Sequence, residues 1–178
     1  MKLILLTKKA FFKIFGKLYN VLMPHKYMNS YVKYLKKLGV NINGMPNYIS
    51  SDAYFDSHNY TNITVDNGVV ISREVMLLTH DYSIARGFTA LNDGEITWNA
   101  SNTPHFLGDI VIGENSFIGA RSSLLPNTYV GKNCIIGACS VVKGVIPDNS
   151  IVVGNPAKVV GNTINWAKKH AELKDYLT

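Results

Sequence analysis

Hydrophobic positions between residues 112 and 142 recur at a strict interval of six, which matches neither the 3.6-residue period of a helix nor the two-residue period of an ordinary strand. The aliphatic residues of this run are Ile112, Ile118, Leu124, Val130, Ile136 and Val142. The residue after most of them is glycine, and the residue four places on is usually small, as at Ser116, Ser122, Thr128, Cys134 and Ser140. We interpret each hexad as one face of a parallel β-helix, with an inward aliphatic, a turn-permissive glycine and a small second inward residue.

The register of the coils follows from the period. Three hexads make one triangular coil, so residues 112–129 and 130–147 are predicted to be successive coils. Ile112 should then stack on Val130, and Ile118 on Ile136, at the strand spacing of about 4.8 Å. Cys134 falls at an inward position and Cys139 at an outward one, so we expect no disulfide between them and a reducing, cytoplasmic location.

Hexads also occur before this run, at Val65, Ile71 and Leu77, while residues 40–55 show only broken hexads and predict an irregular first coil. The pattern vanishes over residues 82–109, which we interpret as a functional loop extruded from the coils. After a last strand at 151–153 and a turn at 154–158, a closing helix is predicted over 162–176. Its N-cap is expected at Thr163 or Asn165, and its packed side consists of Trp166, Ala167, His170 and Leu173.

The N-terminal segment predicts two helices. Residues 3–22 are amphipathic, and residues 27–38 form a second helix that ends at Gly39. The first helix carries Phe11, Phe15, Leu18 and Leu22 on one side and Lys9, Lys13 and Lys17 on the other. Its opening apolar run is too short to span a bilayer and lacks a cleavage site, so we expect neither a transmembrane helix nor a signal peptide. Residues 1–22 could lie on an anionic membrane or pack against protein, and both interpretations stay open.

Length and charge fit this organisation. The chain has 178 residues, 47% of them hydrophobic, which suits one domain with a small appendage. We expect a basic helical segment at 1–39, the β-helix with its loop at 40–160, and a closing helix at 161–178. The net charge of +6 arises from residues 1–51, which hold nine lysines and no acid. Because the remainder carries −3, we do not expect a nucleic-acid binder.

From about Ile49 to Val160, the hexads resemble the hexapeptide-repeat, left-handed β-helix acyltransferases, in particular the branch that O-acetylates sugars and polysaccharides. The resemblance implies acetyl-CoA as donor, a sugar or sugar-lipid acceptor in surface polysaccharide assembly, and a homotrimer with active sites between subunits. One alternative is an N-acetyltransferase acting on an amino sugar nucleotide. Another is a β-helix that serves as a non-catalytic scaffold, because a fold does not fix a function.

His80 is the main catalytic candidate. It lies where the chain leaves the coils, in a Thr-His-Asp stretch that carries the general base in the sugar O-acetyltransferases this chain resembles, and histidine accepts a proton near neutral pH. Asp81 could orient the imidazole or face solvent, and we expect a backbone carbonyl to fix the tautomer. Asp56, from the coil before His80, resembles an acidic position of polysaccharide-modifying relatives, where a carboxylate could hold a sugar hydroxyl next to the base. It could equally be a turn aspartate that binds its own backbone.

The resemblance also implies a site for coenzyme A. Ala120 and Ala138 match main-chain contacts to the donor, and a backbone amide near Ala120 would hold the oxyanion. Lys143, Gly144 and Lys158 match the region that binds the terminal phosphates, at least one coil away from His80. The two alanines could instead be small only because the turns require it.

No metal site is expected, because His80 and His105 are separated by twenty-five residues and an irregular loop. The remaining histidines, His25, His58 and His170, are assigned surface or packing roles. His105, Trp98 and Asn99 could touch a sugar, although nothing in their spacing requires it.

Overall fold

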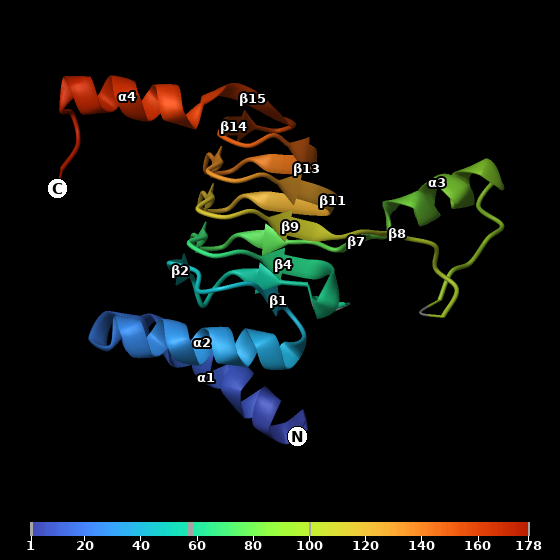
Figure 1. Cartoon of the computed structure of the whole chain (residues 1–178). Coiled ribbons are helices and arrows are strands. Elements are labelled where there is room, and N and C mark those ends of the chain that lie inside the picture. Colours follow the sequence, from blue (N-terminus) through green and yellow to red (C-terminus); the bar gives the residue numbers. More distant parts are fainter. Residues whose placement is uncertain (1, 57–58, 100, 178) are drawn as a thin grey trace.

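The computed structural model describes residues 2–56, 59–99 and 101–177, and places His58 outside these ranges. The side chains of residues 2–6 and of Lys9 are likewise outside the description. The chain forms a left-handed β-helix of stacked triangular coils, with two helices across its N-terminal end, an arm projecting from its side and a helix at its C-terminal end (Figure 1).

Each coil contributes a short strand to each of three parallel faces. The first face consists of β1 (Asn41–Ile42), β4 (Ile63–Val65), β9 (Ile110–Ile112) and the second halves of β11 (Ser123–Val130) and β13 (Val141–Ile146). The second face consists of β2 (Tyr48–Ile49), β5 (Val70–Ile71), β10 (Phe117–Ile118), β12 (Ile135–Ile136) and β14 (Ser150–Gly154). The third face consists of β3 (Tyr54–Phe55), β6 (Met76–Leu77) and the first halves of β11 and β13.

The register predicted from the hexads is confirmed. Ile112 pairs with Val130, and Ile118 pairs with Ile136. The inward aliphatics are almost completely buried, and so are the small residues predicted at the second inward position. Their hydroxyls bind backbone carbonyls of the turns, as when Ser116 Oγ donates to the oxygen of Gly131 at 2.7 Å. A small hydroxyl therefore suits the corner because it satisfies backbone groups inside the coil.

The role predicted for the glycines is wrong. Gly113, Gly119, Gly131 and Gly137 do not have a positive φ, whereas residues two places on do, including Asn115, Arg121, Asn133 and Cys139. A Cβ on Gly119 would lie 2.6 Å from the backbone oxygen of Ile136 in the next coil. Glycine is required there because neighbouring coils approach closely, and the left-handed turn residue comes later in the hexad.

The first coil is more regular than its broken hexads predicted. Its strands β1, β2 and β3 pair in register with β4, β5 and β6 of the second coil. A one-turn 3-10 helix, η1 (Tyr60–Asn62), connects the two coils. The cysteine prediction is confirmed, since both are free, with Cys134 buried and Cys139 exposed.

The loop predicted at 82–109 is an arm with secondary structure of its own. β7 (His80–Asp81) and β8 (Phe106–Leu107) pair antiparallel at its root, and α3 (Ser83–Leu91) follows β7. Trp98 holds the segment that returns from α3 against this helix, because its Nε1 donates to the oxygen of Ala85 at 3.0 Å and to Thr89 Oγ1 at 2.8 Å. The arm projects away from the β-helix at the level of the second and third coils (Figure 1).

The two N-terminal helices close the base of the β-helix. They are α1 (Lys2–Leu22) and α2 (Pro24–Leu38), and α2 ends at Gly39 in a left-handed cap, as predicted. α1 contacts the rest of the chain through residues that include Phe12, whose ring packs at a tilt against tyrosines of α2, Gly16, which lies against Ser51, and Tyr19, whose hydroxyl bonds that of Ser30. The apolar side predicted for this helix faces outward, away from the β-helix. Within the described ranges, no helix has the combination of length and apolar character that crossing a membrane requires.

The C-terminal end differs from the prediction in two ways. The turn after residue 154 leads into a further strand, β15 (Ala157–Asn162), antiparallel to β14. α4 (Thr163–Leu173) then extends away from the β-helix, so the side predicted to be packed is largely exposed (Figure 1). Its N-cap is Asn162, whose side chain accepts from the backbone of Ile164 and Asn165, so the predicted caps at Thr163 and Asn165 are wrong by one to three residues.

Candidate active site

Two candidate residues meet at the corner between the third and first faces, which we call the dyad corner. Asp56 follows β3 and His80 follows β6. Because Phe55 pairs with Leu77, the residues that follow these strands lie one above the other in successive coils. The fold thus places side chains that are twenty-four residues apart in the sequence in direct contact.

The carboxylate of Asp56 is buried, and its oxygen Oδ2 accepts hydrogen bonds from two residues of the next coil. The backbone N–H of Thr79 and the Thr79 hydroxyl each donate to it at 2.9 Å. His80 Nδ1 is a further donor to the same oxygen. The Asp56 side chain is 1% exposed, while that of His80 is 25% exposed, so the imidazole connects a buried charge to the surface.

This contact defines the state of the imidazole. An ionised carboxylate can only accept, so Nδ1 carries a proton and the lone pair of the neutral ring lies on Nε2. The expectation that a backbone carbonyl fixes this tautomer is wrong, since the partner is the Asp56 carboxylate. The Oδ2 of Asp56 bonds Thr79 and His80 of the coil above, so this carboxylate has partners beyond its own turn.

Asp81 has a separate task. Its Oδ1 accepts from the backbone N–H of Ser83 at 2.8 Å, at the start of α3. This is the bond by which an aspartate stabilises a helix N-terminus. Asp81 therefore helps to start α3.

Aromatic rings gather around His80 at the root of the arm. The Tyr82 ring lies 5.1 Å from the His80 ring and 4.8 Å from the His105 ring, centroid to centroid. His105 Nδ1 donates to the oxygen of Thr103 at 3.1 Å, and the two histidine rings are 6.4 Å apart. The separation of His80 and His105 in the sequence does not keep them apart in the fold, because the pairing of β7 with β8 brings these histidines together. This separation is therefore a weak argument against a metal site. In the described part of the chain, no three His, Cys, Asp or Glu side chains converge as metal ligands would.

The Asp56 charge also influences a nearby tyrosine. Burial, the neighbouring Tyr54 and the Asp56 carboxylate, in that order, raise the pKa of Tyr60. Tyr60 therefore stays a neutral phenol beside the buried carboxylate at neutral pH.

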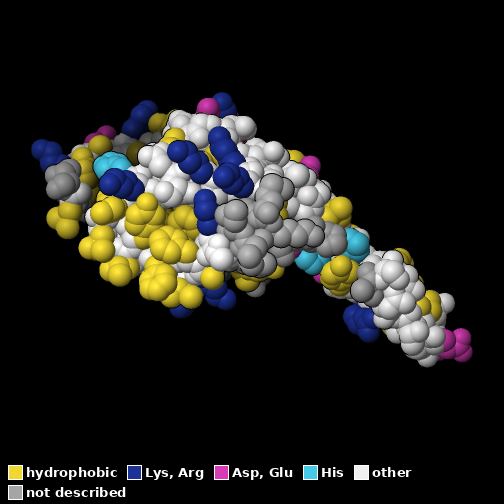
Figure 2. Space-filling view, turned by 90° about the horizontal axis from the view of Figure 1, so that it is seen from below, with side chains coloured by type: hydrophobic (Ala, Val, Ile, Leu, Met, Phe, Trp, Pro, Cys, Tyr) yellow, Lys and Arg dark blue, Asp and Glu magenta, His cyan; other side chains and the backbone are white. Residues whose placement is uncertain are grey.

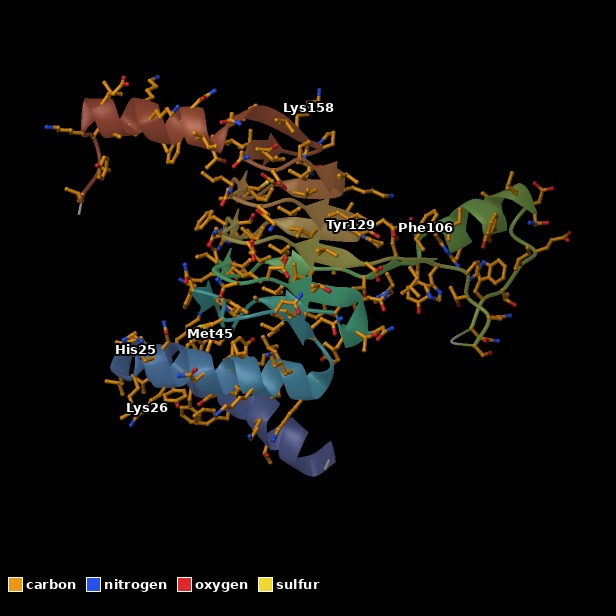
Figure 3. All side chains as sticks on the ribbon, viewed as in Figure 1. His25, Lys26, Met45, Phe106, Tyr129 and Lys158 are labelled. Carbon is orange, nitrogen blue, oxygen red and sulfur yellow. The ribbon has the colours of Figure 1, made fainter. Side chains whose placement is uncertain are left out.

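The residues assigned to coenzyme A fall on two different corners. Ala120 and Ala138 lie between the second and third faces, at what we call the alanine corner, and the carbonyl of Ala120 accepts from the backbone N–H of Cys139 at 2.9 Å. Lys158 on β15 pairs with Val153, which lies against Gly137, so Lys158 belongs to the same corner. It lies at the C-terminal end of the stack of coils (Figure 3). Lys143 and Gly144 lie instead at the dyad corner, two coils beyond Leu77.

Lys143 contacts the arm. Its Nζ lies 5.6 Å from the centre of the Phe106 ring, which is the distance of a cation–π contact. Phe106 is the strand partner of Asp81 and lies at the root of the arm (Figure 3). The chain therefore gathers Asp56, His80 and Lys143 at one corner, and Ala120, Ala138 and Lys158 at another.

Family models match the repeats. One described as bacterial transferase hexapeptide (six repeats) matches residues 109–144, and one described as hexapeptide repeat of succinyl-transferase matches residues 127–163. Residues 109–163 therefore match models of hexapeptide repeats. The hexads from which the coils were predicted are the repeats that these models describe.

Similar proteins are named as acetyltransferases. A Mycobacterium tuberculosis protein named "Probable acetyltransferase" is 47% identical over 66 residues, 35% of this chain and 22% of its own length. The Escherichia coli "Putative lipopolysaccharide biosynthesis O-acetyl transferase WbbJ" is 26% identical over 98 residues, 55% of this chain and 49% of its own length. The match therefore spans less than half the length of these relatives.

A solved structure of galactoside acetyltransferase in complex with coenzyme A shares the fold. Its TM-score is 0.57 at 23% sequence identity, and the match covers 98% of this chain and 89% of that one. At this identity the likeness shows the architecture. It extends beyond the repeats to nearly the whole chain.

Proposed function

We propose that the protein is an O-acetyltransferase that transfers the acetyl group of acetyl-CoA to a sugar hydroxyl in the assembly of a surface polysaccharide. The observation that carries the proposal is the contact of His80 Nδ1 with the buried Asp56 carboxylate at the root of the arm. A histidine oriented by a carboxylate is a general base with its free lone pair on Nε2. The acetyltransferase names of similar proteins support the reaction class.

In this mechanism Nε2 removes the proton from the acceptor hydroxyl, and the oxygen attacks the thioester carbonyl directly. The imidazolium that forms is stabilised by the Asp56 carboxylate. A backbone amide near Ala120 holds the developing oxyanion, and collapse of the tetrahedral intermediate releases coenzyme A as the leaving thiolate, which takes up the proton. Asp56 thereby acts through His80 as a positioning residue.

The active form proposed here is a homotrimer. In one chain the dyad corner and the alanine corner are different corners of the triangular β-helix. A single chain therefore does not place His80 beside Ala120 and Ala138. Side-by-side packing would bring the dyad corner of one subunit to the alanine corner of its neighbour and create one extended groove for coenzyme A. Lys143 and Lys158 would then line the same groove from two subunits.

The decisive experiment is incubation with acetyl-CoA and a panel of sugars and amino sugars, with release of coenzyme A thiol as the readout. Products on hydroxyl groups support the proposal, while products on amino groups would identify an N-acetyltransferase. No thiol release with any acceptor, together with no coenzyme A binding by calorimetry, would leave a scaffold role.

A second experiment tests the donor groove. Lys143→Ala and Lys158→Ala should each raise KM for acetyl-CoA about tenfold and change kcat little, since each removes one charged contact to phosphate. Lys132→Ala is the matched control, because Lys132 pairs with Glu114 at 2.9 Å at the remaining corner. A fall in kcat with KM unchanged would contradict the placement of the groove.

A further inference from the structure

An apolar strip covers the outer side of α1. It consists of exposed side chains that recur at helical spacings of three and four: Phe11, Ile14, Phe15, Leu18, Val21 and Leu22. These side chains are between 44% and 76% exposed. Phe12 and Gly16, which contact the rest of the chain, lie on the other side of α1. The strip therefore points away from the β-helix.

A row of lysines lies on the outer side of the neighbouring helix α2. Lys26, Lys33 and Lys37 are spaced by seven and four residues, so they share one side of the helix, and all three are exposed. The opposite side is buried through residues such as Tyr27 and Leu35. Figure 2 shows the base of the molecule, where hydrophobic side chains gather beside a group of Lys and Arg side chains.

The base of the molecule, formed by α1 and α2, has charged side chains of one sign only, which is positive. Residues 1–51 contain nine lysines and no acid. The first carboxylate, Asp52, binds Lys17 at 3.0 Å and Arg73 at 3.3 Å, and the described residues supply no carboxylate partner to the lysine row. An apolar strip beside such a row is the arrangement by which an amphipathic helix lies in the interface of an anionic bilayer.

A second copy of the chain fits this surface less well. Two copies that met base to base would bring their lysine rows together, which costs free energy by like-charge repulsion. Copies that packed side by side would use the faces and corners of the β-helix, and would leave every base turned toward the same side. A planar bilayer can contact several such bases at once, which multiplies a weak single contact.

We propose that the apolar strip and the lysine row bind an anionic membrane surface and stand the β-helix upright on it, so that the acceptor is a sugar carried by a lipid. The choice of acceptor rests on the proposed function. Taking about 10 Å for the helix layer and about 4.8 Å for each of two coils, His80 stands roughly 20 Å above the base. A glycan attached to a membrane lipid by a phosphate linkage extends into this zone, whereas a free sugar has no need of the surface.

Vesicle binding tests the surface without any acetyl transfer. Wild-type protein should co-sediment with vesicles of phosphatidylglycerol and phosphatidylcholine, more weakly at high salt, and not with phosphatidylcholine alone. Changing Lys26, Lys33 and Lys37 together to Gln should lower the partition coefficient about a hundredfold at low salt, since each lysine near an anionic surface contributes about fivefold. The double change Phe15→Glu and Leu18→Glu should lower it at least about tenfold.

Matched controls are available at the far end of the molecule. Lys168, Lys169 and Lys174 changed together to Gln remove the same charge from exposed positions in and after α4, and Leu177→Glu changes a fully exposed apolar residue. Both controls should bind vesicles within about twofold of wild type. Equal losses in controls and base variants, or no vesicle binding by wild type, would overturn the proposal. So would a strip variant that changes the oligomeric mass in light scattering while vesicle binding persists, because the strip would then be a subunit contact.

The second part of the proposal, that the acceptor is a sugar carried by a lipid, is tested with alkyl glycosides. Wild type should acetylate a dodecyl glycoside held in anionic vesicles faster than the soluble methyl glycoside, and the strip variant should lose this preference while it keeps the methyl glycoside rate. Equal preference in both proteins would overturn the lipid-carried acceptor and leave the proposed acetyl transfer intact. Vesicle binding without turnover of either glycoside by wild type would instead count against the proposed function.

Discussion

Replacing Asp56 with asparagine isolates the charge that the carboxylate supplies to His80. The donors from Thr79 and His80 all address the single oxygen Oδ2. In the Asp56→Asn variant, the side-chain amide oxygen can occupy that position and accept the same bonds. The variant can therefore keep these three hydrogen bonds while it loses the negative charge beside the imidazole.

The size of the effect follows from this difference. A hydrogen bond to a charged group contributes about 1.5–3 kcal/mol, against about 0.5–1.5 kcal/mol for a neutral pair. The charge is needed mostly in the transition state, when the imidazole becomes positive, and the carboxylate is 1% exposed and poorly screened. We expect kcat to fall about ten- to a hundredfold, with KM for acetyl-CoA unchanged.

The assay is steady-state thiol release at saturating donor and acceptor, with the folded fraction of each variant checked by its unfolding transition. Asp81→Asn is the matched control: the same substitution one residue from His80, at a carboxylate that binds Ser83 at the start of α3. It should change kcat by no more than about threefold, because Asp81 acts on helix stability.

A double-mutant cycle makes the reasoning refutable. His80→Ala alone should lower kcat at least about a hundredfold, the low end of a general-base contribution. Because Asp56 acts through His80, Asp56→Asn should cost nothing further in that background. Additive losses, a folded Asp56→Asn enzyme within about threefold of wild type, or an equal loss from Asp81→Asn would each refute the role assigned to the pair.

Three further outcomes are expected. Gly119→Ala should destabilise the protein by about 2–3 kcal/mol in urea unfolding, because its Cβ meets the next coil, whereas Gly87→Ala in α3 meets nothing within 4 Å and should be neutral or stabilising. Burial would raise the pKa of Asp52, but hydrogen bonds from Ser50, Lys17 and others lower it to about 2, so its stabilising effect is present above about pH 4 and is lost as pH falls toward 2. Asp52→Asn should therefore cost about 1 kcal/mol at pH 7 after allowance for solvent screening and much less at about pH 2.5, unlike Asp93→Asn on the arm. Light scattering should give the mass of a trimer, and a fully active monomer would contradict the shared groove.

The register of the coils could be predicted because it depends on one strong constraint. Each inward residue must stack on the one eighteen positions away, so Ile118 and Ile136 report the same site in successive coils. The role of the glycines could not be predicted from the same pattern, since close approach and a positive φ both select glycine. The asparagines at 115, 127, 133 and 149 are the usable signal, because asparagine tolerates the left-handed region that they occupy.

The sequence does not reveal Asp56 and His80 as a pair, although both residues are candidates. The sequence places Asp56 in the coil before His80, but the broken hexads do not show that Phe55 pairs with Leu77, which is the register that brings the two side chains into direct contact. The arm differs, because its helix α3 is short but Ile84, Phe88 and Leu91 already have helical spacing. The local signal is thus present in the arm, whereas the pair requires knowing which coil lies beneath which.

The apolar sides of α1 and α4 reveal a different limit. Periodicity correctly identifies which side of a helix is apolar, but the packing inferred from it for α4 is wrong within one chain, where Trp166 remains exposed. The apolar side of α1, for which no packing partner was assigned, is exposed as well, as at Leu18. An apolar side is selected by whatever covers it in the working assembly, and this can be another subunit or a bilayer. For α1, the charge beside the apolar side favours one of these partners, because the helix lies next to a lysine row to which the described residues offer no carboxylate. The apolar side of α1 together with the lysine row therefore points to an anionic membrane at the base.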